Sequence, residues 1–419
     1  MPAWVAGQAL PAAEGEAPPL SRKEAAPYRT PLAGEPYETT LLGEKIDVPA
    51  RDRGNISSVN LGLTVYSPNQ GDTSVLPMGA YYLRGTRDDG RLRMVVSGFV
   101  NEVDASVKVA GMLEAVGRYE NFIIPFGEYG IADNQTIKGS AVQWGTLSTF
   151  LGLGVRAPAA PYQYDNGWLV QLLGRVGYLY SDETRNTDPG VRLPPDTFLY
   201  GARLRGGYDG IRRNLMDLPH AGKAFGFDFD AVHRAHWGDY GNNIVNFTKG
   251  DTQDYYQFAA YAFSVMGIPG FSEKNRFLAS LHVGVTDTTS TDRYNAFRLT
   301  GGPFAAEALD LRRPNYPGAL YGNTRVANYT LANFEYRREL LFFLYLHLRA
   351  TFIWAQREVV KDVNQIGFKS HTGQNVSAAV TTGFFWGSQI FLQAAWDSGF
   401  LRDGVTGTTF TVMWSKAFR

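Results

Sequence analysis

Apolar and polar side chains alternate residue by residue in five segments between residues 326 and 419. In the last segment two sets lie on opposite faces: Phe410, Val412, Trp414 and Phe418 on one, and Thr411, Met413, Ser415 and Ala417 on the other. A period of two is the period of a β-strand. One face of such a strand can meet lipid and the other the interior of a barrel, although a half-buried strand of a soluble sheet would look the same. Repetition along the chain distinguishes the two.

The same alternation starts near residue 55 and recurs to the end of the chain, interrupted by clusters of Gly, Asp, Asn and Pro that are typical of turns. The segments that show it are 56–66, 75–85, 91–100, 105–109, 118–126, 148–155, 167–181, 197–208, 224–237, 255–266, 276–286, 294–301, 326–338, 341–355, 375–385, 388–396 and 408–418. Because single-chain bacterial barrels have an even number of strands, we expect about 16, with one of the early segments misassigned. The sequence therefore predicts an all-β fold, a transmembrane antiparallel β-barrel.

The region before the alternating segments differs in composition. Residues 10–54 are rich in Pro, Ala, Glu and Gly and show neither helical nor strand periodicity. Residues 1–9 contain the small residues of a cleavage region without a basic start or a full apolar stretch, so they could be the remnant of a signal peptide. We therefore expect two parts, a Pro/Ala-rich tail over 1–54 and a barrel over 55–419.

Composition and charge narrow the class of protein. The chain has 40 Lys plus Arg against 40 Asp plus Glu, a balance that argues against a nucleic-acid binder. Charged residues make up 19%, fewer than the roughly 25% of soluble domains, and no run of about 20 apolar residues could form a helical span. The absence of Cys excludes disulfides and thiolate metal sites. These features favour an integral protein of the bacterial outer membrane, surrounded by outer-membrane lipid.

Three strands indicate which charged side chains face the lumen. The apolar face of 167–181 leaves Arg175 on the opposite side, and that of 197–208 leaves Arg203 and Arg205 there. In the strand 224–237 the alternation predicts two further sets: Phe225, Phe227, Phe229 and Trp237 outward, and Asp228, Asp230, Arg234 and His236 inward. Arginine and aspartate would then share one lumen wall. They could form an ion-selecting constriction or a polar filling that neutralises itself, and the sequence leaves both open.

Loop lengths predict how the barrel is oriented. The reversals at 337–340 and 385–389 are tight and suit the periplasmic side, whereas 238–252, 302–325 and 357–372 are long and suit the outside. A loop as long as 302–325 inside a compact barrel is usually functional or folded inward. We therefore expect it to enter the lumen.

Around this loop the sequence resembles the Omp85 superfamily of bacterial surface-antigen barrels. Arg298-Leu-Thr-Gly-Gly302 is similar to the strand end before that family's inward-folded extracellular loop. The stretch 328–340, an apolar run ending in Glu-Tyr-Arg-Arg-Glu-Leu, resembles the strand after it, and 346–354 resembles the next one. The resemblance covers residues 294–419. It implies an outer-membrane barrel that takes part in protein translocation or insertion, membrane biogenesis or lipid movement, with a client protein or periplasmic partner.

The chain departs from the family's pattern at this loop. The family's loop has an Arg-Gly-aromatic tip that docks on an inward Asp, but here residues 309–318 lack that tip and Ala355 occupies the Asp position. Arg312 or Arg313 could replace the tip, with Glu335 or another lumen carboxylate as its partner, and Arg349 is a further lumen candidate. The family's periplasmic POTRA modules are a second departure, because residues 1–54 are too short to contain one. A homo-oligomer or a separate partner could supply that part.

The sequence lacks the common motifs of soluble enzymes that we searched for. There is no Gly-x-Ser-x-Gly elbow, no His-Glu-x-x-His motif and no P-loop. His233 and His236, the nearest approach to a metal site, would face opposite sides of one strand. We therefore expect no enzyme, no cofactor and no metal.

Three hypotheses remain after this search. The first is an Omp85-like barrel that works through a weakly sealed seam between its first and last strands. The second is a general diffusion channel resembling a porin, and the third is a scaffold or outer-membrane enzyme.

Overall fold

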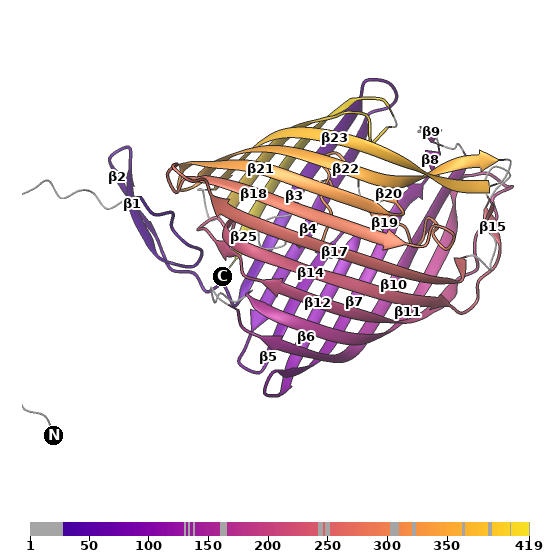
Figure 1. The fold of residues 1–419 in the computed structure, drawn as a ribbon, viewed down its shortest axis with the longest axis horizontal. Coiled ribbons are helices and arrows are strands. Elements are labelled where there is room, and N and C mark those ends of the chain that lie inside the picture. Colours follow the sequence, from indigo (N-terminus) through magenta and orange to yellow (C-terminus); the bar gives the residue numbers. More distant parts are fainter. Residues whose placement is uncertain are drawn as a thin grey trace, which may run out of the picture.

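The computed structural model describes residues 28–129, 131–132, 135–136, 139–159, 166–241, 246–247, 252–301, 310–320, 324–362, 365–383, 388–402 and 404–418. Within these residues the chain forms one closed antiparallel β-barrel (Figure 1). No helix in these described residues is both long enough and apolar enough to cross a membrane.

The barrel wall consists of sixteen long strands, and one two-residue strand, β13 (Arg212–Arg213), is paired beside them. The sixteen are β3 (Ile56–Pro68), β4 (Ser74–Thr86), β5 (Gly90–Ser97), β6 (Val100–Ala110), β7 (Leu113–Glu128), β10 (Ser140–Ala157), β11 (Gly167–Thr187), β12 (Thr197–Asp209), β14 (Pro219–Arg234), β17 (Asp254–Gly267), β18 (Asn275–Thr286), β21 (Tyr329–Leu341), β22 (Leu344–Asp362), β23 (Gln365–Gly383), β24 (Ser388–Asp397) and β25 (Gly407–Phe418). Each pairs with the next along the chain, and β25 pairs with β3 to close the wall. The predicted fold class and strand number are confirmed.

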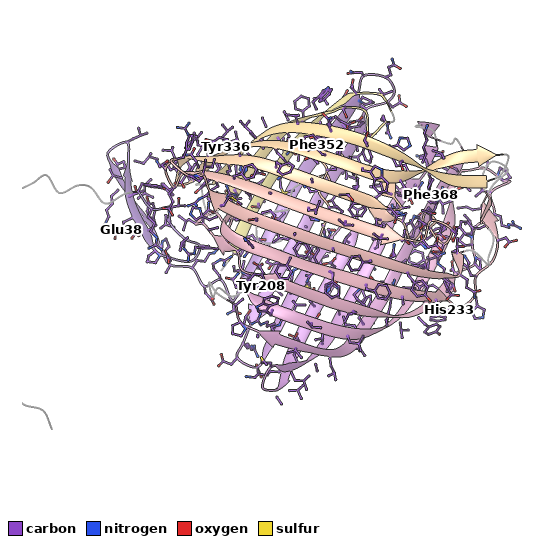
Figure 2. The ribbon with its side chains drawn as sticks, in the orientation of Figure 1. Glu38, Tyr208, His233, Tyr336, Phe352 and Phe368 are labelled. Carbon is purple, nitrogen blue, oxygen red and sulfur yellow. The ribbon has the colours of Figure 1, made fainter. Side chains whose placement is uncertain are left out.

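Alternation along each strand separates an apolar outer surface from a polar interior. On β25, Phe410 and Val412 are 55% and 50% exposed, whereas Thr411 and Met413 are buried. The other strands repeat this arrangement, and Phe352 on β22 stands on the outer face of the wall (Figure 2). An apolar surface of this extent would be unfavourable in water, so it is suited to lipid.

The two ends of the barrel differ. At one end, which we call the terminal end, β3 begins and β25 ends, and connections as short as 111–112 and 342–343 join the strands. The opposite end, the loop end, carries the long connections 235–253 and 287–328. The predicted separation of tight turns from long loops is therefore present, with exceptions at the loop end: β5 and β6 reverse tightly at 98–99, and β22 and β23 pair as far as Asp362 opposite Gln365.

Three predicted boundaries are wrong. The reversal predicted at 337–340 lies within β21, which continues to Leu341 before the turn at 342–343. The extra strand is not one of the early segments but 294–301, because it lies inside the loop 287–328 and contributes only β19 (Phe297–Arg298), which pairs with β20 (Arg325–Val326). Residues 357–372 are not a loop, because β22 and β23 continue as a paired hairpin beyond the wall (Figure 1). The remaining short strands are β8 (Ile131–Ala132), β9 (Gln135–Thr136), β15 (Tyr240–Gly241) and β16 (Asn246–Phe247).

The segment 28–54 has regular structure that its composition did not predict. It contains a hairpin of β1 (Tyr37–Leu41) and β2 (Glu44–Val48), beside the end of the barrel where the chain terminates (Figure 1). Leu32 pairs with Asn214 in the connection between β12 and β14. The hairpin was missed because two strands of five residues give too short an alternation within a Pro-rich stretch.

Charged contacts hold this segment against the terminal end. The guanidinium groups of Arg51 and Arg53 both donate to the carboxylate of Asp217, which is 2% exposed. Thr30 donates to Glu339 on β21 at 2.9 Å. The segment is therefore tied to connections and strands far from β3 along the wall.

We expect the variant Asp217→Asn to release this segment. Breaking a buried ion pair costs about 3 kcal/mol or more, but an amide still accepts hydrogen bonds and tolerates the positive φ of 57° at this position, so we expect a loss of about 2 kcal/mol. Trypsin should then cleave after Arg51 or Arg53 about thirtyfold faster than in the unmodified protein, as measured by fragment mass. The control is Asp47→Asn, at an exposed carboxylate on β2. Equal cleavage rates in both variants would contradict the anchoring role of Asp217.

Candidate functional site: the lumen and its loop

Paired charges from neighbouring strands line one wall of the lumen. Arg203 and Arg205 on β12 lie directly opposite Asp230 and Asp228 on β14 in the strand register. Their side chains pair across the strands, at 2.8 Å for Arg203 to Asp230 and 2.6 Å for Arg205 to Asp228. Arg203 also contacts Glu120 on β7 at 2.6 Å. The structure thus brings together four of the predicted lumen residues, as pairs that neutralise one another.

Arg118 extends this group toward β6. It pairs with Asp104 on β6 and with Glu120, and it is 6% exposed. Because each strand contributes its inward positions at the same height, positive and negative charges alternate around this wall. The arrangement fits the polar filling that the sequence left open beside an ion-selecting constriction.

Arg175 and Arg234 lie apart from this group. Arg175 faces inward on β11, where it donates to Ser148 and lies 5.5 Å from the ring centre of Phe150. Arg234 ends β14 at the loop end, fully buried, and pairs with Asp292 of the loop 287–328 at 2.5 Å.

The prediction of which side chains face outward and which face inward is wrong just after Arg234. Trp237 was expected to face outward but is 3% exposed and lies beneath the guanidinium of Arg234, at 4.1 Å. His236 was expected to face inward but is exposed. The reason is that β14 ends at Arg234, so the alternation does not extend to these two residues.

Residues 310–320 of the long loop contact both sides of the lumen. Arg313 pairs with Glu102 on β6 at 2.6 Å, and Arg349 on β22 donates to the side-chain oxygen of Asn315 at 3.1 Å. In the order of strands around the wall, seven steps separate β22 from β6, close to half of the circuit. This stretch therefore connects nearly opposite walls. Residues 302–309 and 321–323 of the same loop lie outside the described residues.

Arg312 and Arg313 have different surroundings. Arg312 lies 5.9 Å from the ring centre of Tyr261 on β17, whereas Arg313 reaches Glu102. Glu335, the predicted partner for one of them, instead binds Arg349 and His347, each at 2.8 Å. Glu102 is a different lumen carboxylate, and sequence reasoning did not single it out because it is 211 residues from Arg313.

The charge of Asp310 depends on its arginine neighbours. Burial alone would raise the pKa of this carboxyl, but Arg312, Arg93 and Arg313 lower it below its ordinary value. Asp310 and Arg312 also border a polar cavity of about 260 Å³ together with Arg93, Asp104 and Arg205. The loop thus adds charges of both signs to the wall that it faces.

A buried tyrosine of the loop contacts a carboxylate of the wall. Tyr316 is completely buried in an apolar cluster that includes Ala355 and Phe400, and its hydroxyl donates to Asp397 on β24. Burial raises the pKa of Tyr316, and the carboxylate of Asp397 raises it further. This contact joins the loop to β24, and sequence reasoning did not single it out because Asp397 lies 81 residues from Tyr316.

Glu128 on β7 holds the two ends of the loop together. It is 1% exposed and accepts from Arg298 at 3.0 Å and from Arg325 at 3.1 Å. The indole of Trp144 donates to the same carboxylate. Arg298 belongs to the Arg-Leu-Thr-Gly-Gly sequence that carries the family resemblance, so that sequence has a structural task here.

Metal chemistry has little support in the described residues, where no group of three or more His, Cys, Asp and Glu side chains could hold a metal ion. His233 is exposed at the loop end and contacts Asp254 at 2.7 Å (Figure 2).

No known protein family matches this sequence, and no curated protein matches it. Solved structures match its fold. CdiB from Acinetobacter baumannii gives a TM-score of 0.51 at 10% identity, over 91% of this chain and 65% of that protein's chain. BamA from Haemophilus ducreyi lacking POTRA domains 1–3 gives 0.49 at 11% identity, over 92% and 75% of the two chains. CdiB from Escherichia coli gives 0.46 at 12% identity, over 93% and 68%.

At such low identity the similarity is one of fold. The chain spans slightly less than two thirds of the length of CdiB from Acinetobacter baumannii. It is similar to CdiB in its barrel, which agrees with the fold that the resemblance to the Omp85 superfamily implies.

Proposed function

We propose that this chain is an Omp85-like barrel of the bacterial outer membrane, that its long loop occludes the lumen, and that it takes part in protein translocation or insertion, membrane biogenesis or lipid movement. The observation that carries the proposal is the stretch 310–320, which contacts β6 through Arg313 and β22 through Asn315. A loop held at nearly opposite walls divides the lumen. Such a barrel needs the loop to move before a large solute or an unfolded chain can pass.

The anchoring of the loop supports this reading. Its two ends meet at Glu128, its centre pairs with Glu102, and Tyr316 is buried against Asp397. Removing one partner of a buried charge pair leaves the other charge unpaired, which costs about 3 to 5 kcal/mol. The loop therefore has a definite position, and a change in that position would act as a switch between closed and open states.

The first hypothesis from the sequence required a weakly sealed seam between the first and last strands. The pairing of these strands in the structure does not support that part of it. β25 pairs with β3 continuously from Gly407 opposite Pro68 to Phe418 opposite Ser57. A wall paired along this whole length is not weakly sealed. The proposal therefore rests on the loop, with an extended client protein or a periplasmic partner as the molecule that would displace it. We assign no catalytic residue to the chain.

A general diffusion channel is the second candidate, favoured by the polar cavity of about 260 Å³ beside the loop. Small ions could pass there while the loop stays in place. The two candidates differ in what the loop does to conductance.

The double variant Arg312→Ala with Arg313→Ala should raise single-channel conductance several-fold in planar bilayers, because the loop loses its pairing with Glu102. Deletion of residues 303–324 should raise it further. The matched control is Arg175→Ala, an inward arginine whose described contacts are to Ser148 and Phe150 on β10, away from the loop. A large, steady conductance in the intact protein, unchanged in the double variant, would favour the diffusion channel.

The pH dependence of the closed state follows from Asp310. A carboxyl with a lowered pKa contributes stability that is present above its unfolded pKa, about 3.9, and is lost as the pH falls through its lower folded pKa. The closed conductance should therefore stay constant between pH 7 and about pH 4. The variant Asp310→Asn should be more open at pH 7 and should show no further change over this range. A step in conductance of the unmodified protein near pH 6 would mean that another group, such as a histidine, controls the loop.

A further inference from the structure

Two strands of the wall stop short of the loop end. β5 has 8 residues and β6 has 11, whereas their neighbours β4 and β7 have 13 and 16. β4 pairs with β5 only from Ala80 onward, so its residues 74–79 have strand partners only on β3. On the other side, β6 pairs with β7 only as far as Phe122. Beyond it the backbone N–H of Ile123 donates to the carbonyl of Phe99 in the turn, and Ile124 and Glu128 have partners on β10. The wall, described throughout 51–129, thus has a notch between β4 and β7 above the turn 98–99.

The sequence places a proline on the β4 flank of this notch. Pro77 lies in the part of β4 without a β5 partner. Proline lacks a backbone N–H and occurs in sheets at edges or bulges. The β4 flank thus contains a residue that disfavours the addition of another strand.

The notch lies in the part of the wall whose outer surface is apolar. Val75 and Pro77 face outward on β4, and Val75 is 56% exposed. Val75 lies opposite Val65 on β3, which in turn lies opposite Phe410 on β25, an outward residue of the lipid-facing surface. The flank of the notch is therefore continuous with the surface that meets lipid.

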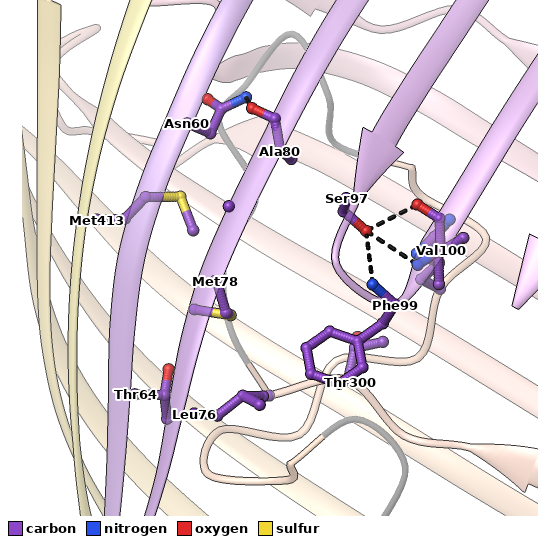
Figure 3. A pocket seen from close by; sticks show the side chains of 13 residues that line it. Asn60, Thr64, Leu76, Met78, Ala80, Ser97, Phe99, Val100, Thr300 and Met413 are labelled. Carbon is purple, nitrogen blue, oxygen red and sulfur yellow. Dashed lines mark hydrogen bonds between the residues drawn. The ribbon is translucent and has the colours of Figure 1, made fainter. Parts of the chain in front are cut away.

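An apolar pocket lies directly behind the notch (Figure 3). Its lining includes Leu76, Met78, Phe99, Val100 and Met413, and the loop backbone at Thr300 and Gly301 closes its inner side. The cavity is narrow, about 40 Å³, but methionine side chains are flexible and can adjust to an occupant. Asn60, Thr64, Ser97 and Arg313 also border the pocket, but most of its exposed lining is apolar and suits hydrocarbon.

The turn 98–99, which forms the base of the notch, is held by side-chain hydrogen bonds. The side-chain oxygen of Ser97 donates to the carbonyl of Val100 at 2.7 Å and accepts from the backbone N–H of Val100 at 3.0 Å (Figure 3). The side chain of Asn101 accepts from the backbone N–H of Ser97 at 3.0 Å. These bonds stabilise the tight turn that carries Phe99 at the base of the notch.

We propose that this notch is a lateral binding site for a single acyl chain of a membrane lipid, which enters from the apolar outer surface and ends in the pocket behind β4. The occupant is hydrocarbon because the flank continues the lipid-facing surface and the lining is apolar. A polypeptide strand is disfavoured because the β4 flank carries Pro77, which has no backbone N–H to donate. This site goes beyond the proposed function and does not depend on the loop being displaced.

A fluorescent reporter inside the wall tests the proposal, and the chain has no Cys to interfere with single-cysteine labelling. Three labelled variants are reconstituted in phosphatidylcholine vesicles whose acyl chains carry bromine. Met78→Cys reports from the pocket, Ala379→Cys from a buried inward position on β23, and Val412→Cys from the outer surface. Quenching at position 78 should be several-fold stronger than at position 379 and should approach that at position 412.

A matched pair of glycine variants tests whether the notch is the route. Gly79 lines the pocket, and a Cβ there would meet only Leu61, at 3.7 Å. Gly117 on β7 is its counterpart away from the notch, where a Cβ would meet only Leu151, also at 3.7 Å. Gly79→Ile should reduce quenching at position 78 several-fold, whereas Gly117→Ile should leave it unchanged. Electrophoretic mobility before and after heating verifies that each variant is folded.

Two results would overturn the proposal. Quenching at position 78 as weak as at position 379 would mean that acyl chains do not enter, and an extended polypeptide would then be the occupant to test. Quenching at position 78 that persists in folded Gly79→Ile would mean that bromine reaches the label by another route. Neither result bears on the loop, whose role depends on the conductance of the arginine variants.

Discussion

Backbone hydrogen bonding in an apolar medium is the constraint on which the rest of this structure depends. Lipid offers no partner to an N–H or C=O group, so a sheet that crosses a bilayer must close on itself. Closure through β25 and β3 fixes which side chains face outward and which face inward. It also brings inward charges from strands far apart in sequence into one small volume, where they must pair. Arg203 with Asp230 and Arg313 with Glu102 are results of that requirement.

The alternation of apolar and polar residues was enough to predict the barrel, its strand number and the inward placement of Arg203, Arg205, Asp228 and Asp230, because a period of two is a local property. Prediction failed where the pattern and the strand differ in length. At Trp237 the pattern continues past the end of β14, and at 357–372 the strands β22 and β23 continue past the end of the pattern. It also failed for partners. Nothing near Arg313 in the sequence indicates Glu102, and nothing near Tyr316 indicates Asp397, because wall closure alone brings these residues together.

Charged side chains are concentrated in the lumen, and apolar side chains are concentrated behind the notch. Charged groups gather where β6, β7, β12 and β14 face the loop, and apolar groups gather behind the shortened strands β5 and β6. The loop backbone at Thr300 and Gly301 lies at the boundary, since it closes the apolar pocket while Arg313 farther along the loop pairs with Glu102. A displacement of the loop would therefore change both compartments at once.

The contacts of Arg51 and Arg53 with Asp217 have a consequence for the order of assembly. These arginines precede the first strand of the wall, but their partner lies 166 and 164 residues further along the chain, in the connection before β14. The segment 28–54 therefore cannot take its final position until at least half of the wall exists. Loop closure over such a separation is slow. The part of the described chain that comes first in sequence is thus among the last to find its place during folding.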